Sequence, residues 1–312
     1  MNPNTKIKVV GVGGAGGNAI SRMALAKIQG VELIALNCDA QDLKKTKASQ
    51  VLQIGRNLTK GLGAGMNSEI GRLAAEEQKE EINQLLKGAD MIFITCGLGG
   101  GTGTGAAPVV AELAKNLGAL VVAVVTTPFS FEGTHRAQVA REGLEVLKSK
   151  VDTLLIIPND KILSQGDTAT TLVSAFWRCD EILRQAVQGI TDLIFLPGII
   201  NVDFADLRTI MKDSGPAFFG QGQAKGERRV ETAVNLAVNS PLINVSISGA
   251  RGILYNVSGG GDLSLDEIAE ASKIITKNAD ARAKVIFGAV QDARLPKGEI
   301  KITVIATGFG KK

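Results

Sequence analysis

Short apolar runs alternate with amphipathic segments along the first half of the chain. Five of these runs predict buried strands, at 6–10, 31–36, 91–95, 119–126 and 153–157. The segments between them carry apolar residues at helical spacing, at 19–28, 69–87, 106–117 and 134–148. Strands that alternate with helices build a parallel sheet with helices on both faces. The pattern therefore predicts a doubly wound α/β domain.

The hydrophobic pattern changes in the second half. Residues 170–195 form one long helical pattern, which Pro197 and Gly198 close. Four later runs predict strands, at 242–248, 253–257, 285–290 and 300–306, and two segments predict helices, at 228–239 and 264–278. We therefore expect a doubly wound domain at 1–169, a central helix and loop at 170–200, and a smaller α+β domain at 201–312.

Residues 97–105 read Gly-Leu-Gly-Gly-Gly-Thr-Gly-Thr-Gly and join a predicted strand to a predicted helix. Without Cβ atoms, backbone N–H groups can crowd around an anion, and the helix N-terminus adds partial positive charge. Thr102 and Thr104 add hydroxyl donors, and Pro108 stands where a first helical turn tolerates proline. A tight turn needs only one or two glycines, so the segment predicts a phosphate cradle.

A second glycine segment, Gly-Val-Gly-Gly-Ala-Gly-Gly at 11–17, follows the first strand. Its spacing fits a dinucleotide fold, but the second strand ends in Asn37 where such a site favours an acid, although Asp39 is near. An NAD-dependent oxidoreductase stays open as an alternative. Two glycine segments on strand–helix junctions fit one mononucleotide with several phosphates better. A P-loop is excluded, because no Gly-Lys-Ser/Thr follows either segment.

Composition narrows the class of protein. The net charge of the 312 residues is +4, too small to indicate a nucleic-acid partner. The three cysteines form no CxxC pair, which indicates a reducing compartment without disulfides or a zinc site. A single histidine argues against a histidine-based catalytic triad. The apolar runs are shorter than a membrane span and the N-terminus is polar, so we expect a cytoplasmic protein.

Phe176 and Asp180 are four residues apart on the long predicted helix, so they share one face. An aromatic ring can stack on a base, and a carboxylate can accept from guanine N1–H and N2–H, donors that adenine lacks. A core phenylalanine beside a solvated aspartate is the simpler interpretation, and these two residues alone favour it.

The motifs together resemble a known family. Gly-Gly-Gly-Thr-Gly-Thr-Gly after a strand is similar to the signature of the tubulin/FtsZ GTPases, and Asn-Val-Asp-Phe-Ala-Asp at 201–206 matches the FtsZ pattern Asn-x-Asp-Phe-Ala-Asp. The likeness extends over nearly the whole chain, and it implies that GTP or GDP is bound by the glycine segments, an acid–arginine pair and the base-binding side chains. These residues are Gly14, Ala15, Gly16, Gly17, Asn18, Gly100, Gly101, Thr102, Gly103, Thr104, Glu132, Arg136, Phe176 and Asp180.

The resemblance also implies a catalytic loop. Asn201, Asp203 and Asp206 are expected to enter the nucleotide site of the next subunit, whereas the simpler interpretation of the acids is that they favour a helix start. Mg²⁺ is expected because a triphosphate needs cations, with no protein side chain assigned as its ligand. Residues 53–65 resemble the loop that flanks the γ-phosphate, and Met66 stands where the family usually has a small residue.

The expected function follows from the family. It is GTP hydrolysis activated by head-to-tail self-assembly, in filaments that build the division ring with other division proteins. We expect no nucleic-acid partner and no direct membrane binding, since the family's C-terminal linker and tail are missing from these residues. A filament scaffold that binds GTP without hydrolysing it is the alternative within the same family.

Overall fold

The computed structural model describes residues 5–163, 171–239, 247–277, 279–292 and 294–309. The described chain divides into two compact units, an N-terminal unit of Thr5–Gln188 and a C-terminal unit that begins at Gly189. The boundary between them falls within one helix, α9 (Leu172–Phe195). Within the described ranges, no helix is both long and apolar enough to cross a bilayer.

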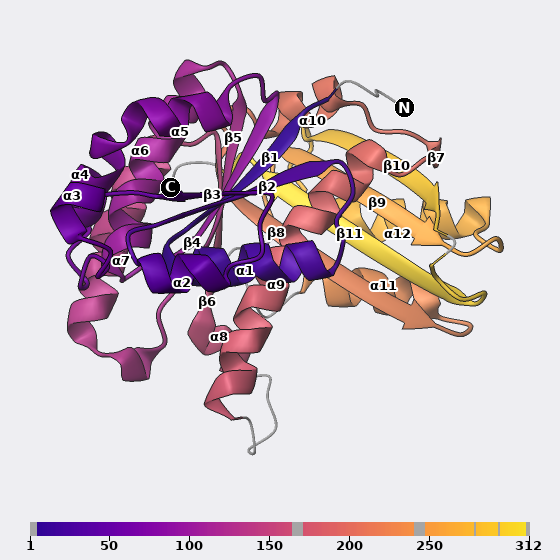
Figure 1. Cartoon of the computed structure of the whole chain (residues 1–312). Coiled ribbons are helices and arrows are strands. Elements are labelled where there is room, and N and C mark those ends of the chain that lie inside the picture. The colour runs from indigo at the N-terminus through magenta and orange to yellow at the C-terminus, as the bar shows by residue number, and fades with distance from the viewer. Residues whose placement is uncertain (1–4, 164–170, 240–246, 278, 293, 310–312) are drawn as a thin grey trace. The chain divides into compact units, whose positions relative to one another are not determined.

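The N-terminal unit is built on a parallel sheet with the strand order β3-β2-β1-β4-β5-β6 (Figure 1). Its strands are β1 (Ile7–Val12), β2 (Val31–Asn37), β3 (Gln50–Gln53), β4 (Met91–Gly97), β5 (Leu120–Thr127) and β6 (Thr153–Pro158). Every neighbouring pair in this sheet runs parallel. Helices cover both faces of such a sheet, which explains why its strands are almost continuous apolar runs. The predicted doubly wound fold is confirmed.

Within residues 5–163, nine helical segments surround this sheet. They are α1 (Gly13–Leu25), α2 (Ala40–Lys45), α3 (Arg56–Thr59), α4 (Ser68–Glu77), α5 (Lys79–Leu86), α6 (Gly101–Asn116), η1 (Ser130–Glu132), α7 (Thr134–Lys148) and α8 (Asn159–Leu163). Helix α1 packs on β1, β2 and β4, and α6 packs on β4 and β5. The crossovers β1→β2 and β4→β5 leave the centre of the sheet in opposite directions, so right-handed connections place α1 and α6 on opposite faces.

Two helices begin earlier than the sequence predicts. Helix α1 begins at Gly13 and α6 at Gly101, so both glycine segments are first helical turns rather than loops. The prediction that Pro108 lies in a first turn is therefore wrong, because Pro108 lies inside α6. Proline has no N–H, so the carbonyl of Thr104 lacks its usual helical donor at that point.

The predicted helix at 69–87 is two helices, α4 and α5. Gln78 separates them with a backbone outside the helical region, at φ −103° and ψ 24°. Its side chain is buried, and its Oε1 accepts a hydrogen bond from the Gly55 N–H. This contact with a distant turn stabilises the break, and periodicity within the segment does not reveal it.

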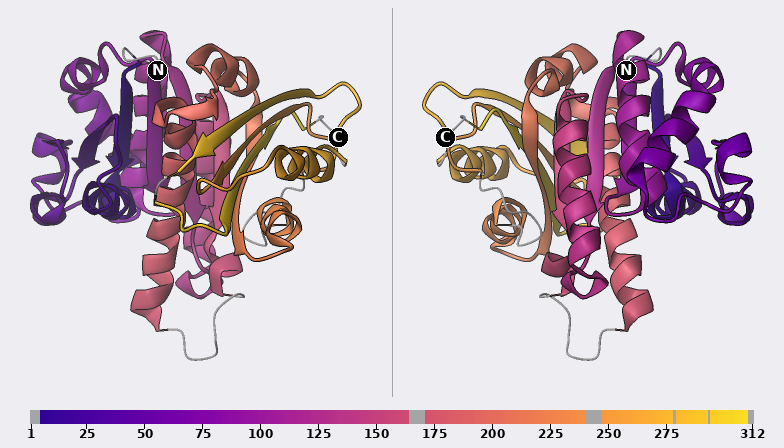
Figure 2. Two further views of the ribbon diagram at one scale, coloured as in Figure 1. Left: turned by 90° about the vertical axis from the view of Figure 1, so that its right-hand side faces the viewer. Right: turned by 90° about the vertical axis from the view of Figure 1, so that its left-hand side faces the viewer.

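The C-terminal unit is a second sheet with the order β8-β11-β9-β10-β7. Its strands are β7 (Gly198–Ile200), β8 (Gly215–Lys225), β9 (Gly252–Gly259), β10 (Lys284–Gln291) and β11 (Glu299–Thr307). Strands β9 and β10 are parallel, and the other pairs are antiparallel. Its helices are α10 (Phe204–Met211), α11 (Arg229–Val238) and α12 (Leu265–Thr276). Helices α11 and α12 lie together on one face of this sheet, over a shared apolar core (Figure 2).

Strand β8 is not predicted from the sequence, since two glycines interrupt its apolar pattern. A Cβ atom on Gly220 would lie 1.8 Å from the Ala237 carbonyl oxygen, and one on Gly222 would lie 2.0 Å from that of Ala233. The glycines therefore let the backbone of α11 touch the strand. Most of the strand predicted at 242–248 falls on residues 240–246, which lie outside the described residues.

Candidate functional site

The two glycine segments meet at one edge of the N-terminal sheet. Strands β1 and β4 are parallel neighbours, with Val12 beside Cys96, so α1 and α6 begin side by side. A Cβ atom on Gly13, whose φ is +73°, would lie 3.0 Å from the Gly103 nitrogen. Two helix N-termini, each with unpaired N–H groups and the positive end of a helix dipole, therefore converge on one point. This arrangement suits an anion with several negative oxygens.

A cleft opens beside these N-termini. Its backbone part is formed mainly by Gly13, Gly14, Ala15, Gly100, Gly101, Thr102 and Gly103, and its side-chain part by Glu132, Arg136, Asn159, Phe176, Cys179 and Asp180. Ala64 and Gly65, from the loop that the sequence assigns to the γ-phosphate, also line it. Ten of the fourteen residues predicted to bind nucleotide therefore share one cleft.

Gly16 and Gly17 are buried behind the cleft rather than in its wall. A Cβ atom on Gly16 would lie 2.6 Å from the Thr95 carbonyl oxygen, and one on Gly17 would lie 3.0 Å from Thr46 Oγ1. Both glycines thus serve the close packing of α1 on the sheet and its neighbours. Their predicted contact with nucleotide stays a prediction.

Asn18 and Thr104 also lie outside the wall of the cleft. Asn18 is exposed on α1. Thr104 is buried, its Oγ1 accepts the Gly99 N–H at 2.9 Å, and it lines a second cavity on the other side of α6. In this structure Thr104 therefore supports the glycine segment instead of offering its hydroxyl to the cleft.

Arg136 supplies a positive charge to the cleft. It lies against Gly99, where a φ of +94° and the absence of a Cβ allow the contact, since a Cβ would lie 2.8 Å from Arg136 Cγ. Glu132 orients the guanidinium through an ion pair of 2.9 Å. Arg136 Nε is buried and has no hydrogen-bond partner among the described residues. An unpaired buried donor in the wall of a cleft is a group that a ligand can satisfy.

Asn159 was not predicted as a site residue. It follows β6, it is buried, and its Oδ1 has no hydrogen-bond partner within the described part of the chain. The sequence shows only a strand that ends in Pro158-Asn159-Asp160, a pattern that gives no role to the amide. Its place in the cleft makes it a candidate contact for a sugar or a base.

The other end of the cleft carries aromatic side chains. Phe176 of α9 is 41% exposed and packs edge-on against Phe129, with ring centroids 5.3 Å apart. Phe129 in turn stacks on Phe131 at 4.9 Å. The cluster holds Phe176 in place while leaving ring surface in the cleft wall, which is the geometry needed to stack a flat base.

Asp180 lies one helical turn beyond Phe176, as the spacing predicts. Arg22 of α1 donates from Nε to Asp180 Oδ2 at 3.1 Å. Burial raises the pKa of Asp180 to about 6, although Arg22 opposes this shift. The guanidinium of Arg22 lies 5.0 Å from the centre of the Trp177 ring, a cation–π contact. Nothing in the sequence pairs Arg22 with Asp180, because the two are far apart in the chain.

Cys179 also lines the cleft, next to Asp180. Burial, together with the neighbouring carboxylate of Asp180, raises the pKa of its thiol to about 12. The reactive form of cysteine is the thiolate. Cys179 therefore packs the helix and has no nucleophilic character.

The predicted catalytic loop belongs to the C-terminal unit. Asp203 is the N-cap of α10, and its Oδ1 accepts the Asp206 N–H at 2.7 Å. Asn201 Oδ1 accepts the Gly198 N–H at 2.8 Å. Asn201, Asp203 and Asp206 thus lie together at the start of α10. Asp203 caps this helix, as the simpler interpretation of the acids expects. Among the described residues, no group of three or more His, Cys, Asp or Glu side chains could hold a metal ion.

Comparison with known proteins agrees with this geometry. A model of the tubulin/FtsZ family GTPase domain matches residues 6–167, and a model of the FtsZ family C-terminal domain matches residues 215–310. An empty FtsZ dimer of M. jannaschii is 48% identical, with 97% of this chain and 88% of that chain covered and a TM-score of 0.92. A tryptophan-to-tyrosine mutant of the same protein is 47% identical, with 98% and 92% covered and a TM-score of 0.92.

The fold extends to more distant proteins. CetZ2 from Haloferax volcanii, solved as a protofilament with GTPγS bound, is 22% identical, with 99% of this chain and 94% of that chain covered and a TM-score of 0.83. The family models and the 48% identity cover nearly the whole chain. The chain therefore belongs to the tubulin/FtsZ family and carries both its GTPase domain and the FtsZ C-terminal domain.

Proposed function

We propose that this chain binds GTP in the cleft and hydrolyses it to GDP and phosphate when subunits assemble head to tail. The observation that carries the proposal is the chemistry of the cleft, with two helix N-termini at one end and an aromatic–carboxylate pair at the other. The first end suits phosphates, and the second suits guanine. We further propose that the filaments act in the cytoplasm at the division site with other division proteins, without nucleic acid or direct membrane contact.

The phosphate end acts through fixed dipoles. Backbone N–H groups of Gly14, Gly101 and Thr102 stand at the helix N-termini, and Arg136 adds a full positive charge. Such preorganised donors stabilise charge that moves to the leaving phosphate. Mg²⁺ would supply further neutralisation of the triphosphate, with no side chain of the described residues assigned to hold it.

The base end selects guanine. Asp180 keeps acceptor capacity on Oδ1 and on the remaining lone pair of Oδ2, because Arg22 uses only one position. Guanine N1–H and N2–H can occupy these acceptors while Phe176 stacks on the ring. Adenine presents no such pair of donors, so the same carboxylate rejects ATP. An NAD-dependent activity has no support in this arrangement.

Hydrolysis needs an activated water molecule, and in the proposal Asp203 and Asp206 of a neighbouring subunit orient it, with Asn201 beside them. General base catalysis of this kind contributes about 10²–10⁴-fold. A carboxylate 4 Å from a phosphate charge is repelled by about 4 kcal/mol at an effective dielectric of 20, a cost that cations offset. The dimeric assembly of the M. jannaschii relative supports a shared site.

A mixing experiment tests the shared site. Asp206→Ala leaves the glycine cradle intact, so it should bind GTP as the parent does but hydrolyse it at a small fraction of the parent's rate. Thr102→Arg places bulk and charge in the cradle, so it should bind GTP poorly yet still offer both acids. The mixture should release phosphate faster than the sum of the two proteins alone, measured together with sedimentation.

Asp266→Ala is the matched control, because Asp266 is an exposed acid in the first turn of α12. It should hydrolyse GTP at the parent's rate and gain nothing from mixing. If mixed filaments form and phosphate release never exceeds the sum, the acids do not act across an interface. Filaments that hold GTP uncleaved in the parent protein would instead support the scaffold alternative.

A further inference from the structure

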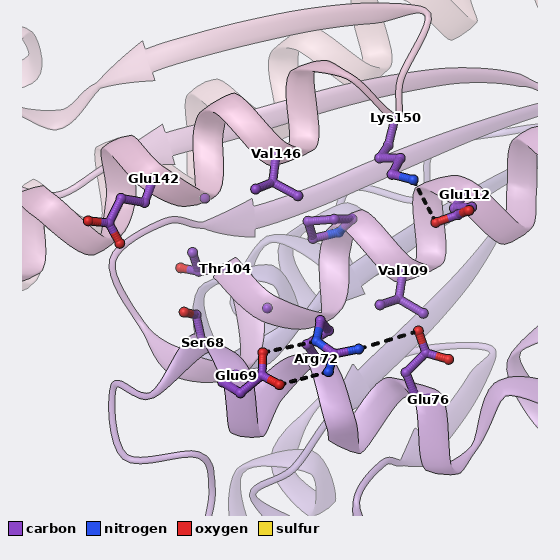
Figure 3. A pocket seen from close by; sticks show the side chains of 13 residues that line it. Ser68, Glu69, Arg72, Glu76, Thr104, Val109, Glu112, Glu142, Val146 and Lys150 are labelled. Atoms are coloured by element: carbon purple, nitrogen blue, oxygen red, sulfur yellow. Dashed lines mark hydrogen bonds and ion pairs between the residues drawn. The ribbon is translucent and has the colours of Figure 1, made fainter.

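A second cavity, of about 430 Å³, lies between α4, α6 and α7 (Figure 3). It is lined by Thr104, Gly105 and Pro108 of α6, whereas Gly101, Thr102 and Gly103 of the same helix line the nucleotide cleft. The two hollows therefore lie on opposite sides of the first turns of α6. Nothing in the family assignment gives this second cavity a role.

Close backbone contacts fix the walls of this cavity. A Cβ atom on Gly105 would lie 1.8 Å from the Ser68 carbonyl oxygen, and one on Gly143 would lie 2.1 Å from Thr104 Cγ2. Helices α4 and α7 thus touch α6 directly, and the space between them is preformed. Its volume lies within the range of roughly 300–1,000 Å³ that small-molecule sites occupy.

The rim of the cavity is acidic. Four carboxylates line it, those of Glu69, Glu76, Glu112 and Glu142, against two cations. Both cations are already engaged, since Arg72 pairs with Glu69 at 2.7 Å and with Glu76 at 3.9 Å, and Lys150 pairs with Glu112 at 2.9 Å (Figure 3). The lining therefore has two more negative than positive charges.

Glu142 of α7, labelled in Figure 3, forms no ion pair with a cation of the described part of the chain. Within the described residues its partner is the neutral amide of Gln138, which donates at 3.0 Å. Thr104 of α6 lines the same cavity, and Pro108, four residues later, has no N–H to donate to its carbonyl.

The remaining wall is apolar. Pro108 and Val109 of α6 and Val146 of α7 form it, and Val146 is 51% exposed. An apolar surface of this kind favours a hydrocarbon group, whereas the acidic rim favours a cation. Charge complementarity thus selects one class of ligand, and an anion or a neutral polar molecule is a poorer match.

We propose that this cavity binds a small organic cation with an apolar body, such as an arylalkylammonium, and that its occupancy is coupled to nucleotide. The ammonium group faces Glu142 and the Thr104 carbonyl, and the hydrocarbon lies on Val109 and Val146. The coupling rests on the proposed nucleotide function. It runs through Thr104, whose Oγ1 accepts the Gly99 N–H of the nucleotide cradle.

Binding is tested on the full chain without nucleotide, by calorimetry and by protein-detected NMR. The probe is 4-phenylbutylammonium, and its neutral analogue is 4-phenylbutan-1-ol. The cation should bind about fivefold more tightly than the alcohol, the scale of one exposed ion pair. Equal affinity of the two compounds would overturn the assignment of a cation site.

Three variants locate the binding. Glu142→Gln removes the Glu142 carboxylate and should lower the affinity for the cation about threefold to fivefold. The affinity for the alcohol should not change. Glu145→Gln is the control, since Glu145 is exposed on the same helix outside the cavity lining, and it should change neither. Val146→Trp should block both compounds by filling the cavity. Unchanged binding in Glu142→Gln and Val146→Trp would place the probe elsewhere and overturn the proposal.

The coupling is measured as the affinity for GDP with and without saturating probe. A cation on the far side of the α6 N-terminus should tighten GDP binding by about twofold to fivefold, and GDP should tighten probe binding by the same factor. Val146→Trp should bind GDP normally and lose this response. Equal GDP affinity with and without probe would overturn the coupling. Failure of every protein to bind GDP would refute the proposed function, whereas probe binding in the cavity is measured independently of it.

Discussion

The two ends of the nucleotide cleft differ in the groups that form them, which are backbone groups at one end and side chains at the other. The phosphate end consists of backbone at the starts of α1 and α6, where an added Cβ would often collide with main-chain atoms. The base end consists of side chains, namely Phe176 with its partner Phe129 and Asp180 with its partner Arg22. A backbone site has few degrees of freedom to vary. A side-chain site can be altered one group at a time.

This difference separates folding from specificity. At the phosphate end, the geometry that would bind nucleotide is also the geometry that packs α4, α6 and α7 together, so changes at its tightly packed glycines should act on stability first. At the base end, changes should act on the choice of nucleotide and on its pH dependence, with little effect on folding. The predictions below test this separation, in order of decreasing expected effect.

Gly105→Ala should cause the largest change. Its Cβ would lie 1.8 Å from the Ser68 carbonyl oxygen, and both atoms belong to packed helices that must move apart. Overpacking of this kind should lower the free energy of unfolding by about 3 kcal/mol, measured by denaturant titration.

Gly100→Ala is the matched control, because no atom lies within 4 Å of its added Cβ and its φ is −93°. It should change the stability by less than about 1 kcal/mol. Similar losses in both variants would contradict the packing explanation.

Asp180→Ala should act on nucleotide choice with little change in folding. The loss of a charge-assisted hydrogen bond should weaken GTP binding by roughly 1.5–3 kcal/mol, or about tenfold to a hundredfold in affinity. ATP binding should be nearly unaffected. Competition binding with both nucleotides measures this. Glu80→Ala, which removes an exposed carboxylate on α5, should leave both affinities unchanged. A variant at Asp180 that still discriminates as the parent does would refute its role.

Arg22→Gln should make GTP binding sensitive to pH. Burial raises the pKa of Asp180 to about 6, and Arg22 holds it from rising further. Only the ionised carboxylate accepts from guanine, so affinity is lost as the pH falls through this pKa, and the loss should begin at a higher pH in the variant. Between pH 8 and pH 6.5 the variant should lose about threefold to tenfold in GTP affinity, and the parent should lose less.

The pH effect has its own control. Glu132 and Arg136 line the same cleft but pair with each other, and Glu181 on α9 pairs with Arg184. Asp180→Asn cannot ionise, so its weak GTP binding should show no such pH dependence, with or without Arg22→Gln. If the double variant Asp180→Asn/Arg22→Gln responds to pH as Arg22→Gln alone does, the titrating group is not Asp180.

Met66→Gly should give the smallest effect, a gain in stability. Met66 has a φ of +62°, a left-handed conformation that is costly for a residue with a side chain. Glycine removes that strain, but its greater conformational freedom in the unfolded chain opposes folding. The net gain should be roughly 0.5 kcal/mol in the free energy of unfolding. Leu62→Gly in the same loop is the control, since Leu62 is 86% exposed and its φ is not positive. It should gain nothing.

The sequence predicts the side-chain spacing at the base end of the cleft better than the helix starts at the phosphate end. The four-residue spacing of Phe176 and Asp180 is a property of one helix, so it can be read locally. The starts of α1 and α6 were placed too late because glycine has a low helix propensity, which tertiary packing overrides here. The position of Pro108 follows from the same error.

Residues whose role depends on distant partners were not predictable. Asn159 lines the cleft from the start of α8, and Arg22 of α1 bonds to Asp180, but no periodic pattern links either residue to α9. Strand β8 is not predicted for a related reason. Its glycines are explained only by their close contact with the backbone of α11, which the sequence does not show. Apolar runs, by contrast, predict the long strands of the parallel N-terminal sheet, because burial on both faces of a strand is visible in its own composition.

The parallel pairing of β1 with β4 has a consequence for synthesis on the ribosome. The second edge of β1, at Ile7–Val12, has no partner until β4, at Met91–Gly97, has been translated. At about 5–20 residues per second, this interval lasts roughly 4–16 s. During that time the nascent chain exposes an apolar strand edge, the kind of surface that chaperones protect. Nucleotide cannot rescue it, because half of the cradle has not yet been made.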